Sequence, residues 1–103
     1  MDGKTLFEGI EPQTENSQER ESSRITGKRL FRKISEQQYR CHLSGVLLDV
    51  DDASLDHIVP LSRGGTHTID NIAIVHVAIN RMKGTMSEDE FIGWCRKVVE
   101  WRR

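Results

Sequence analysis

The sequence has few cysteines and no long apolar run, and both absences narrow the classes of protein that fit it. Its 103 residues include two cysteines, Cys41 and Cys95, which are too few for a disulfide framework and too isolated for a zinc knuckle. Both are expected to pack as small buried apolar residues. No apolar run approaches the roughly 20 residues that span a bilayer, and the polar start lacks the apolar core of a secretion signal. The sequence therefore favours an intracellular, cytoplasmic protein without a membrane association.

The chain also lacks the excess of positive charge that is typical of nucleic-acid binders, since its net charge is -1 at pH 7. The charge is unevenly distributed, however. Residues 1–25 hold three basic and six acidic side chains, a net charge of -3, whereas the remainder holds 12 and 10, a net charge of +2. A mildly basic domain behind an acidic segment suits a phosphate backbone better than the total suggests. The densest positive stretch fits DNA contact and a solvated helix face equally well; it comprises Lys28, Arg29, Arg32, Lys33 and Arg40.

Composition divides the chain into two parts. Residues 1–25 are rich in polar types and cannot bury enough apolar surface to offset the ordering entropy, so we predict a flexible acidic tail. Within it, Leu6, Phe7 and Ile10 form an apolar group that can dock on the domain or on a protein partner. Residues 26–103 are predicted to form one small domain.

Apolar patterns predict the elements of that domain. Helical spacing of Leu30, Phe31 and Ile34 predicts a helix over about 27–38. The apolar runs 46–50 and 53–58, separated by two aspartates, predict a β-hairpin. A loop by composition then follows over 60–70.

Two further helices are expected after this loop. The first would be capped by Asp70 or Asn71, carry the apolar run from Ile72 and end before Gly84. The second would begin at the capping box of residues 87–90 and run to about Trp101. Its buried stripe would comprise Phe91, Ile92, Cys95, Val98 and Val99. The predicted fold class is therefore α+β, a hairpin, loop and helix flanked by an N-terminal and a C-terminal helix.

Several polar residues recur at an informative spacing across these elements. They are Asp56-His57-Ile58-Val59-Pro60, Gly64-Gly65, Asn71 and Asn80-Arg81-Met82-Lys83. An acid beside a histidine supplies a hard oxygen ligand and a candidate general base, and an amide from a later element can complete the ligands of a metal. Taken alone, the Asp56-His57 run fits an ordinary strand end equally well, and Asn71 fits a helix cap better. Asn80 on an apolar helix is unusual because a buried amide costs free energy unless it is satisfied.

The order and spacing of these residues, over about 39–83, resemble the catalytic core of the HNH endonucleases, the ββα-metal family that cuts nucleic acid at phosphodiester bonds. The resemblance implies a ββα-metal core. It implies that His57 is the general base acting on a water and that Asp56 is a metal ligand. It also implies that Asn71 holds the loop and orients the histidine, and that Asn80 is a metal ligand at a position occupied by His in many members.

The chemistry of these side chains suggests which metal would bind. Carboxylate and amide oxygens are hard ligands that favour Mg²⁺ or Mn²⁺, so we rank Mg²⁺ first as the single divalent cofactor. The reference pKa of histidine, near 6.5, leaves a neutral imidazole available at neutral pH.

The chain departs from the family at the zinc site by which many HNH proteins brace their core. The two Cys-x-x-Cys places here read Cys41-His42-Leu43-Ser44 and His76-Val77-Ala78-Ile79, so a tetrahedral site lacks two ligands. We predict no structural zinc. Apolar packing of the flanking helices is expected to replace it, through Leu30, Phe31, Ile34, Phe91 and Val98.

The sequence thus predicts a metal-dependent HNH endonuclease that hydrolyses DNA and, as a monomer, nicks one strand. Further DNA contacts are expected at Arg63, His67, Arg81 and Lys83, each of which equally fits a solvated charge or a loop hydrogen bond. The alternatives are a non-cleaving DNA-binding module and a regulatory interaction protein that docks through its acidic tail. The target sequence, the choice of DNA over RNA, the strand outcome, the oligomeric state and the biological role stay open.

Overall fold

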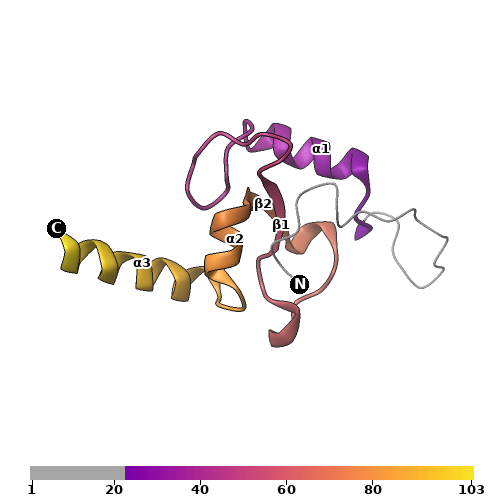
Figure 1. Cartoon of the computed structure of the whole chain (residues 1–103). Helices are drawn as coiled ribbons and strands as arrows, with labels where there is room; N and C mark the ends of the chain where they lie inside the picture. The colour runs from indigo at the N-terminus through magenta and orange to yellow at the C-terminus, as the bar shows by residue number, and fades with distance from the viewer. Residues whose placement is uncertain (1–22) are drawn as a thin grey trace.

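The computed structural model describes residues 23–103. Its helices are α1 (Gly27–Glu36), α2 (Val77–Lys83) and α3 (Glu88–Arg102), its strands are β1 (Ala53–His57) and β2 (Ile72–His76), and two short 3-10 turns cover Leu61–Arg63 and Ile69–Asn71 (Figure 1). Most of the predicted tail lies outside the described residues, and so does the apolar group Leu6, Phe7 and Ile10.

The centre of the fold is an antiparallel pair of strands. β1 pairs with β2 so that Ala53 lies opposite His76 and His57 lies opposite Ile72. α1 packs against β2, and α2 packs against both strands. The predicted fold class, an α+β protein with a ββα core between flanking helices, is therefore confirmed.

The predicted partner of β1 is wrong. Residues 46–50 form no strand and make only an isolated bridge between Leu47 and Arg40. They expose Val46, Leu47 and Val50, whereas β2 is an almost fully buried, β-branched run that can pack on both faces. The loop consequently lies inside the hairpin, between β1 and β2, and the helix predicted from Ile72 begins only at Val77.

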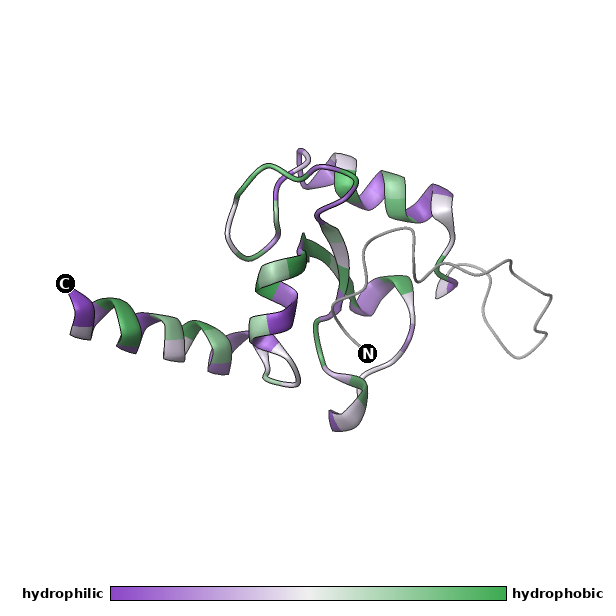
Figure 2. Cartoon of the chain, in the orientation of Figure 1, coloured by the Kyte–Doolittle hydropathy of each residue, from purple (hydrophilic) through white to green (hydrophobic). Residues whose placement is uncertain are grey.

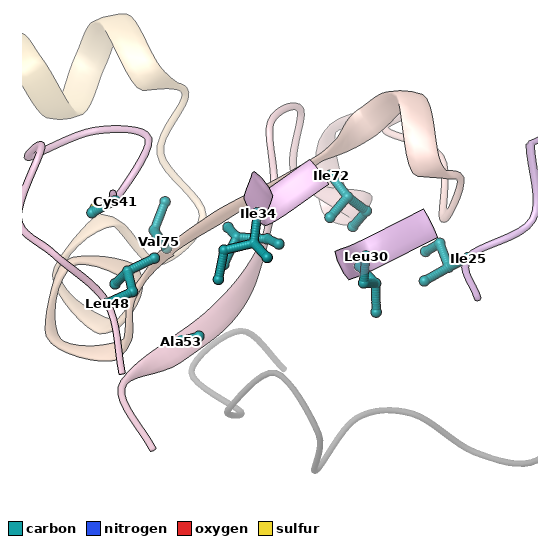
Figure 3. Packing of buried hydrophobic residues seen from close by; sticks show 9 residues of the cluster. Ile25, Leu30, Ile34, Cys41, Leu48, Ala53, Ile72 and Val75 are labelled. Carbon is teal, nitrogen blue, oxygen red and sulfur yellow. The ribbon is translucent and has the colours of Figure 1, made fainter. Parts of the chain in front are cut away.

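The hydrophobic core lies between α1, the segment after it and the two strands. Thr26 caps α1 by accepting a hydrogen bond from the Arg29 amide at 3.2 Å. The predicted bracing by Leu30 and Ile34 is confirmed, whereas Phe31 is 53% exposed. The core cluster comprises Ile25, Leu30, Ile34, Cys41, Leu48, Ala53, Ile72, Ile74 and Val75 (Figure 3).

α3 begins at the predicted residues, but its packing differs from the prediction. Ser87 and Glu90 form the capping box, and Phe91 is buried. Ile92 is half-buried, but the rest of the predicted buried stripe is wrong because Val98, Val99 and Cys95 are exposed. The reason is visible in Figure 1, where α3 extends away from the strands and meets the core only at its start. Across residues 23–103 the helices are all too short or too polar to cross a bilayer.

Candidate functional site

A buried ion pair joins the end of α2 to β1. Asp56 and Lys83 both have fully buried side chains, and the Asp56 Oδ1 accepts a hydrogen bond from the Lys83 Nζ at 3.0 Å. The same ammonium donates to the carbonyl oxygen of His57 at 3.2 Å. A buried charge needs such partners because desolvation is otherwise costly. This burial argues against the predicted contact between Lys83 and phosphate.

Asn80 lies one turn before Lys83 on α2 and is fully buried as well. Its Nδ2 donates to the Ser54 Oγ and to the Leu55 carbonyl oxygen, both at 2.8 Å, so β1 fixes the orientation of the amide directly before Asp56. Within residues 23–103 the Asn80 Oδ1 has no hydrogen-bond partner. A buried acceptor in this condition costs ~1–3 kcal/mol, which marks Oδ1 as a group that needs a ligand.

His57 ends β1 and is 5% exposed. Its Nε2 lies 2.9 Å from the Nδ1 of His67, and the ring centroids are 5.2 Å apart. One ring must donate and the other accept, so a proton is shared between them. This contact was not predicted from the sequence, because nine loop residues separate the two histidines.

The loop from Ile58 to Asn71 is closed by the side chain of Asn71. The Asn71 Oδ1 accepts from the Val59 amide at 2.9 Å, and its Nδ2 donates to the carbonyl oxygens of Val59 and Thr66 at 2.9 and 2.8 Å. Gly65 packs so closely here that a Cβ would overlap the Val59 carbonyl oxygen. Asn71 therefore fixes the chain directly after His57, and Gly65 makes the close approach possible.

Two other residues that were predicted to contact DNA lie on the surface. Arg63 forms an ion pair with Glu90 of α3, and Arg81 is exposed on α2. The hydrogen bond from Arg63 is the largest cause that lowers the pKa of Glu90 from 4.5 to about 2, and the same pair raises the pKa of Arg63. The ion pair holds the 3-10 turn Leu61–Arg63 against the start of α3.

The places that carry zinc ligands in many HNH proteins make structural contacts here. The Cys41 Sγ accepts from the backbone amides of Ser44 and His76 at 3.4 and 3.3 Å. Burial acts to raise the pKa of the Cys41 thiol, but hydrogen bonds from Ser44, His76 and Leu43 together lower it. His76 caps α2 through a hydrogen bond from the Ala78 amide. No cluster of three or more His, Cys, Asp or Glu side chains suited to a metal occurs in the described part of the chain.

Fold and site together define a ββα domain in which an acid and a histidine end the first strand and an amide comes from the helix. Residues 38–85 match the model of the HNH endonuclease family. This match confirms the resemblance, and the matched segment contains Asp56, His57, Asn71 and Asn80. The family usually uses a divalent metal, and its nucleases act on DNA. A comparison with curated proteins found no match to the chain.

Proposed function

We propose that this protein is a metal-dependent DNA endonuclease in which His57 is the general base and Asp56 and Asn80 hold one divalent ion. The observation that carries the proposal is the Asn80 amide, whose nitrogen is anchored on β1 while its buried oxygen has no hydrogen-bond partner in the described range. A carboxylate and an amide oxygen from adjoining elements form a hard donor set. These residues therefore fit a divalent cation.

The donor set favours Mg²⁺, with Mn²⁺ as the next choice. When bound, the ion would neutralise charge on the phosphate and stabilise the departing oxygen. Lys83 holds the Asp56 carboxylate in place and balances its buried charge. We therefore assign Lys83 to positioning Asp56 rather than to DNA.

His57 supplies the base for the attacking water. We place that water at the His57 Nε2, which accepts its proton while the water oxygen bonds to phosphorus and a phosphorus–oxygen bond of the backbone breaks. The His67 ring contacts this nitrogen, so the proposal requires that this exposed ring turns aside when DNA binds. Asn71 keeps the segment after His57 fixed, so the base holds the attacking water at a constant position relative to the phosphate.

DNA phosphates are proposed to contact Arg63, His67 and Arg81, all of which are exposed. Residues 23–103 of one chain hold one such site, so a single chain would cut one strand and produce a nick.

The test is nicking of a supercoiled plasmid in Mg²⁺ by the wild-type protein, His57→Ala and Asn80→Ala. His42→Ala is the matched control, because His42 is exposed and contacts Glu88 of α3 rather than the site. We expect the wild type and His42→Ala to nick alike and His57→Ala to lose about 10²-fold to 10⁴-fold of the rate. Circular dichroism establishes that each variant is folded. Equal nicking by His57→Ala and the wild type would indicate a contaminant, and DNA binding by the wild type without any nicking would favour the non-cleaving module.

The choice of metal is tested separately by removing all divalent ions with a chelator and adding back Mg²⁺, Mn²⁺ or Ni²⁺. Mg²⁺ and Mn²⁺ should restore cleavage because both prefer oxygen ligands. Activity with Ni²⁺ alone would contradict the ranking.

A further inference from the structure

α3 carries an apolar surface that nothing in the described part of the chain covers. Its exposed side chains are Trp94, Cys95, Val98, Val99 and Trp101, which we call the α3 stripe. Trp94 and Val98 are each 60% exposed and Trp101 is 83% exposed. Figure 2 shows apolar residues recurring along α3 as it extends from the body of the protein. An apolar stripe of this kind marks an interaction site.

The stripe is independent of the nuclease site and continuous with a groove. α3 lies outside the segment that matches the HNH family. A cavity of about 610 Å³ runs beside it, and its apolar lining includes Leu43, Ile79, Met82, Phe91, Cys95 and Val99. Two members of the stripe therefore face this cavity. A helix of 15 residues that projects from its domain is also marginal without a packing partner.

The charges on α3 indicate what the partner is. Its first turn is acidic, with Glu88, Asp89 and Glu90. Its second half and the residue after it are basic, with Arg96, Lys97, Arg102 and Arg103 against one acid, Glu100. A second α3 in the antiparallel direction would place each acidic end beside a basic end and align the helix dipoles favourably. Glu88 and Glu90 already contact His42 and Arg63, so Asp89 is the acidic group that is available to a partner.

The size of the surface also suits a small symmetric dimer. With the exposed fractions above, the two tryptophans alone present on the order of 300 Å² of apolar area. The remaining members of the stripe bring it close to the roughly 600 Å² per partner of the smallest specific interfaces. Cys95 is the middle residue of α3. In a two-fold antiparallel pair of helices the middle residues meet near the axis.

We propose that a second copy of this chain docks on the α3 stripe, with the two α3 helices packed antiparallel about a two-fold axis beside Cys95. The dimer stands apart from the nuclease chemistry, so its test measures mass and cross-linking rather than cleavage. The mass of the full chain by light scattering should be twice the 11.8 kDa of one chain. Val98→Asp should give a single-chain mass, because it buries a charge in the interface. Val50→Asp is the matched control, with 62% exposure at a site outside α3, and it should stay dimeric.

A single-chain mass for the wild type at about 100 µM would overturn the proposal. If the tryptophans of that monomer were also protected from acrylamide quenching, the cover of the stripe would be another part of the same chain, such as residues 1–22, and the proposal would fail equally.

Cross-linking of the wild-type chain tests the axis while the α3 stripe is intact. Mild oxidation with diamide, which converts two thiols into a disulfide, should link the wild-type chain through Cys95, since Cys41 is buried. Cys95→Ser should give no linked dimer. Asp89→Cys in the Cys95→Ser background should also give none, because in an antiparallel pair the two residues 89 lie at opposite ends. Efficient linkage through residue 89 would indicate a parallel pair and overturn the arrangement.

A charge reversal at the same position tests the orientation in solution. In the antiparallel pair Asp89→Lys faces the basic end of its partner and should weaken dimerisation about fivefold. In a parallel pair the new lysine would face the acidic turn and tighten it. A tighter dimer would contradict the proposal.

Discussion

At the scale of single residues, two polar side chains of α2 define the candidate site. Asn80 and Lys83 are one turn apart on the same face of the helix, both are buried, and both reach β1. The sequence indicated a ligand at Asn80 and a phosphate contact at Lys83. In the structure both side chains point inward. Asn80 donates a hydrogen bond to the backbone of Leu55, the residue before Asp56, and Lys83 forms an ion pair with Asp56 itself.

Replacing Lys83 should therefore lower the stability of the fold rather than directly remove a contact with DNA. Lys83→Met leaves the Asp56 carboxylate buried without its cation, and we expect the free energy of unfolding in urea to fall by about 3–5 kcal/mol. Arg81→Met, two positions away and exposed, should change it by less than about 0.5 kcal/mol while weakening DNA binding. If the Lys83→Met protein were as stable as the wild type but bound DNA poorly, the original prediction that Lys83 contacts DNA phosphates would be supported instead.

Gly65 gives a second prediction at this scale. A Cβ at this position overlaps the Val59 carbonyl oxygen and meets the Asn71 amide, so Gly65→Ala must displace the loop beside His57. We expect a loss of about 2–4 kcal/mol in stability, with a matching loss of nicking. Gly27→Ala, where a Cβ meets nothing within 4 Å, should be neutral or slightly stabilising. Thermal denaturation of the two variants compares them directly, and equal midpoints would contradict the close packing at Gly65.

At the scale of elements, the loop of residues 58–71 is held at both sides. Asn71 fixes it to the end of β1, and the pair between Arg63 and Glu90 fixes it to α3. Glu90 serves two purposes because it also accepts a hydrogen bond from the Ser87 amide at the start of α3. The position of the loop thus depends on a carboxylate whose charge can be titrated.

The lowered pKa of Glu90 predicts a pH dependence of stability. The folded value of about 2 lies below the ordinary 4.5, so the contribution is present above about pH 4.5 and is lost as the pH falls towards 2. Glu90→Gln keeps a side chain that can complete the capping box but removes the charge. Its thermal midpoint should therefore fall less than that of the wild type between pH 5 and pH 2.5, whereas Glu36→Gln, at an exposed position at the end of α1, should follow the wild type. Parallel pH profiles for all three proteins would show that the ion pair contributes nothing in solution.

The elements also show how far the sequence could predict the fold. The capping box at Ser87 is a set of local hydrogen bonds, and the helix that follows it begins at the expected place. α1 also begins where the spacing of its apolar residues predicted. The pairing of β1 was predicted wrongly because an aspartate pair offered a nearby reversal, whereas the real partner follows 14 residues of loop. A short apolar run such as 72–76 has no periodicity that separates a strand from a helix.

The sequence predicted which residues form the candidate site but not the contacts that they make, and their catalytic and metal-binding roles stay predictions. The types and spacing of Asp56, His57, Asn71 and Asn80 are fixed by the chemistry that they would share, so the linear sequence reveals them. The contact between His57 and His67 depends on how the loop folds. The burial of Lys83 depends on the packing of α2 against β1, which spacing alone does not encode.

At the scale of the whole molecule, the proposed dimer would determine whether the proposed nuclease nicks its DNA or cuts both strands. Two chains joined by α3 hold two sites, so both strands of one duplex could be cut in one encounter. We expect wild-type protein to convert supercoiled plasmid partly to the linear form, and Val98→Asp to accumulate nicks while its total cleavage per chain stays within about twofold. Gel analysis of the time course separates the two products. Identical product ratios for the two proteins would show that the dimer does not couple the sites.

The most direct test of the nuclease assignment is chemical rescue of His57→Ala. The variant lacks only the proposed base, so added imidazole can enter the vacated space and accept the proton of the attacking water. We predict that plasmid nicking in Mg²⁺ is lost in His57→Ala and partly restored by imidazole, and that the same imidazole does not restore Asn80→Ala. Nicking by His57→Ala at the wild-type rate without imidazole would contradict the account.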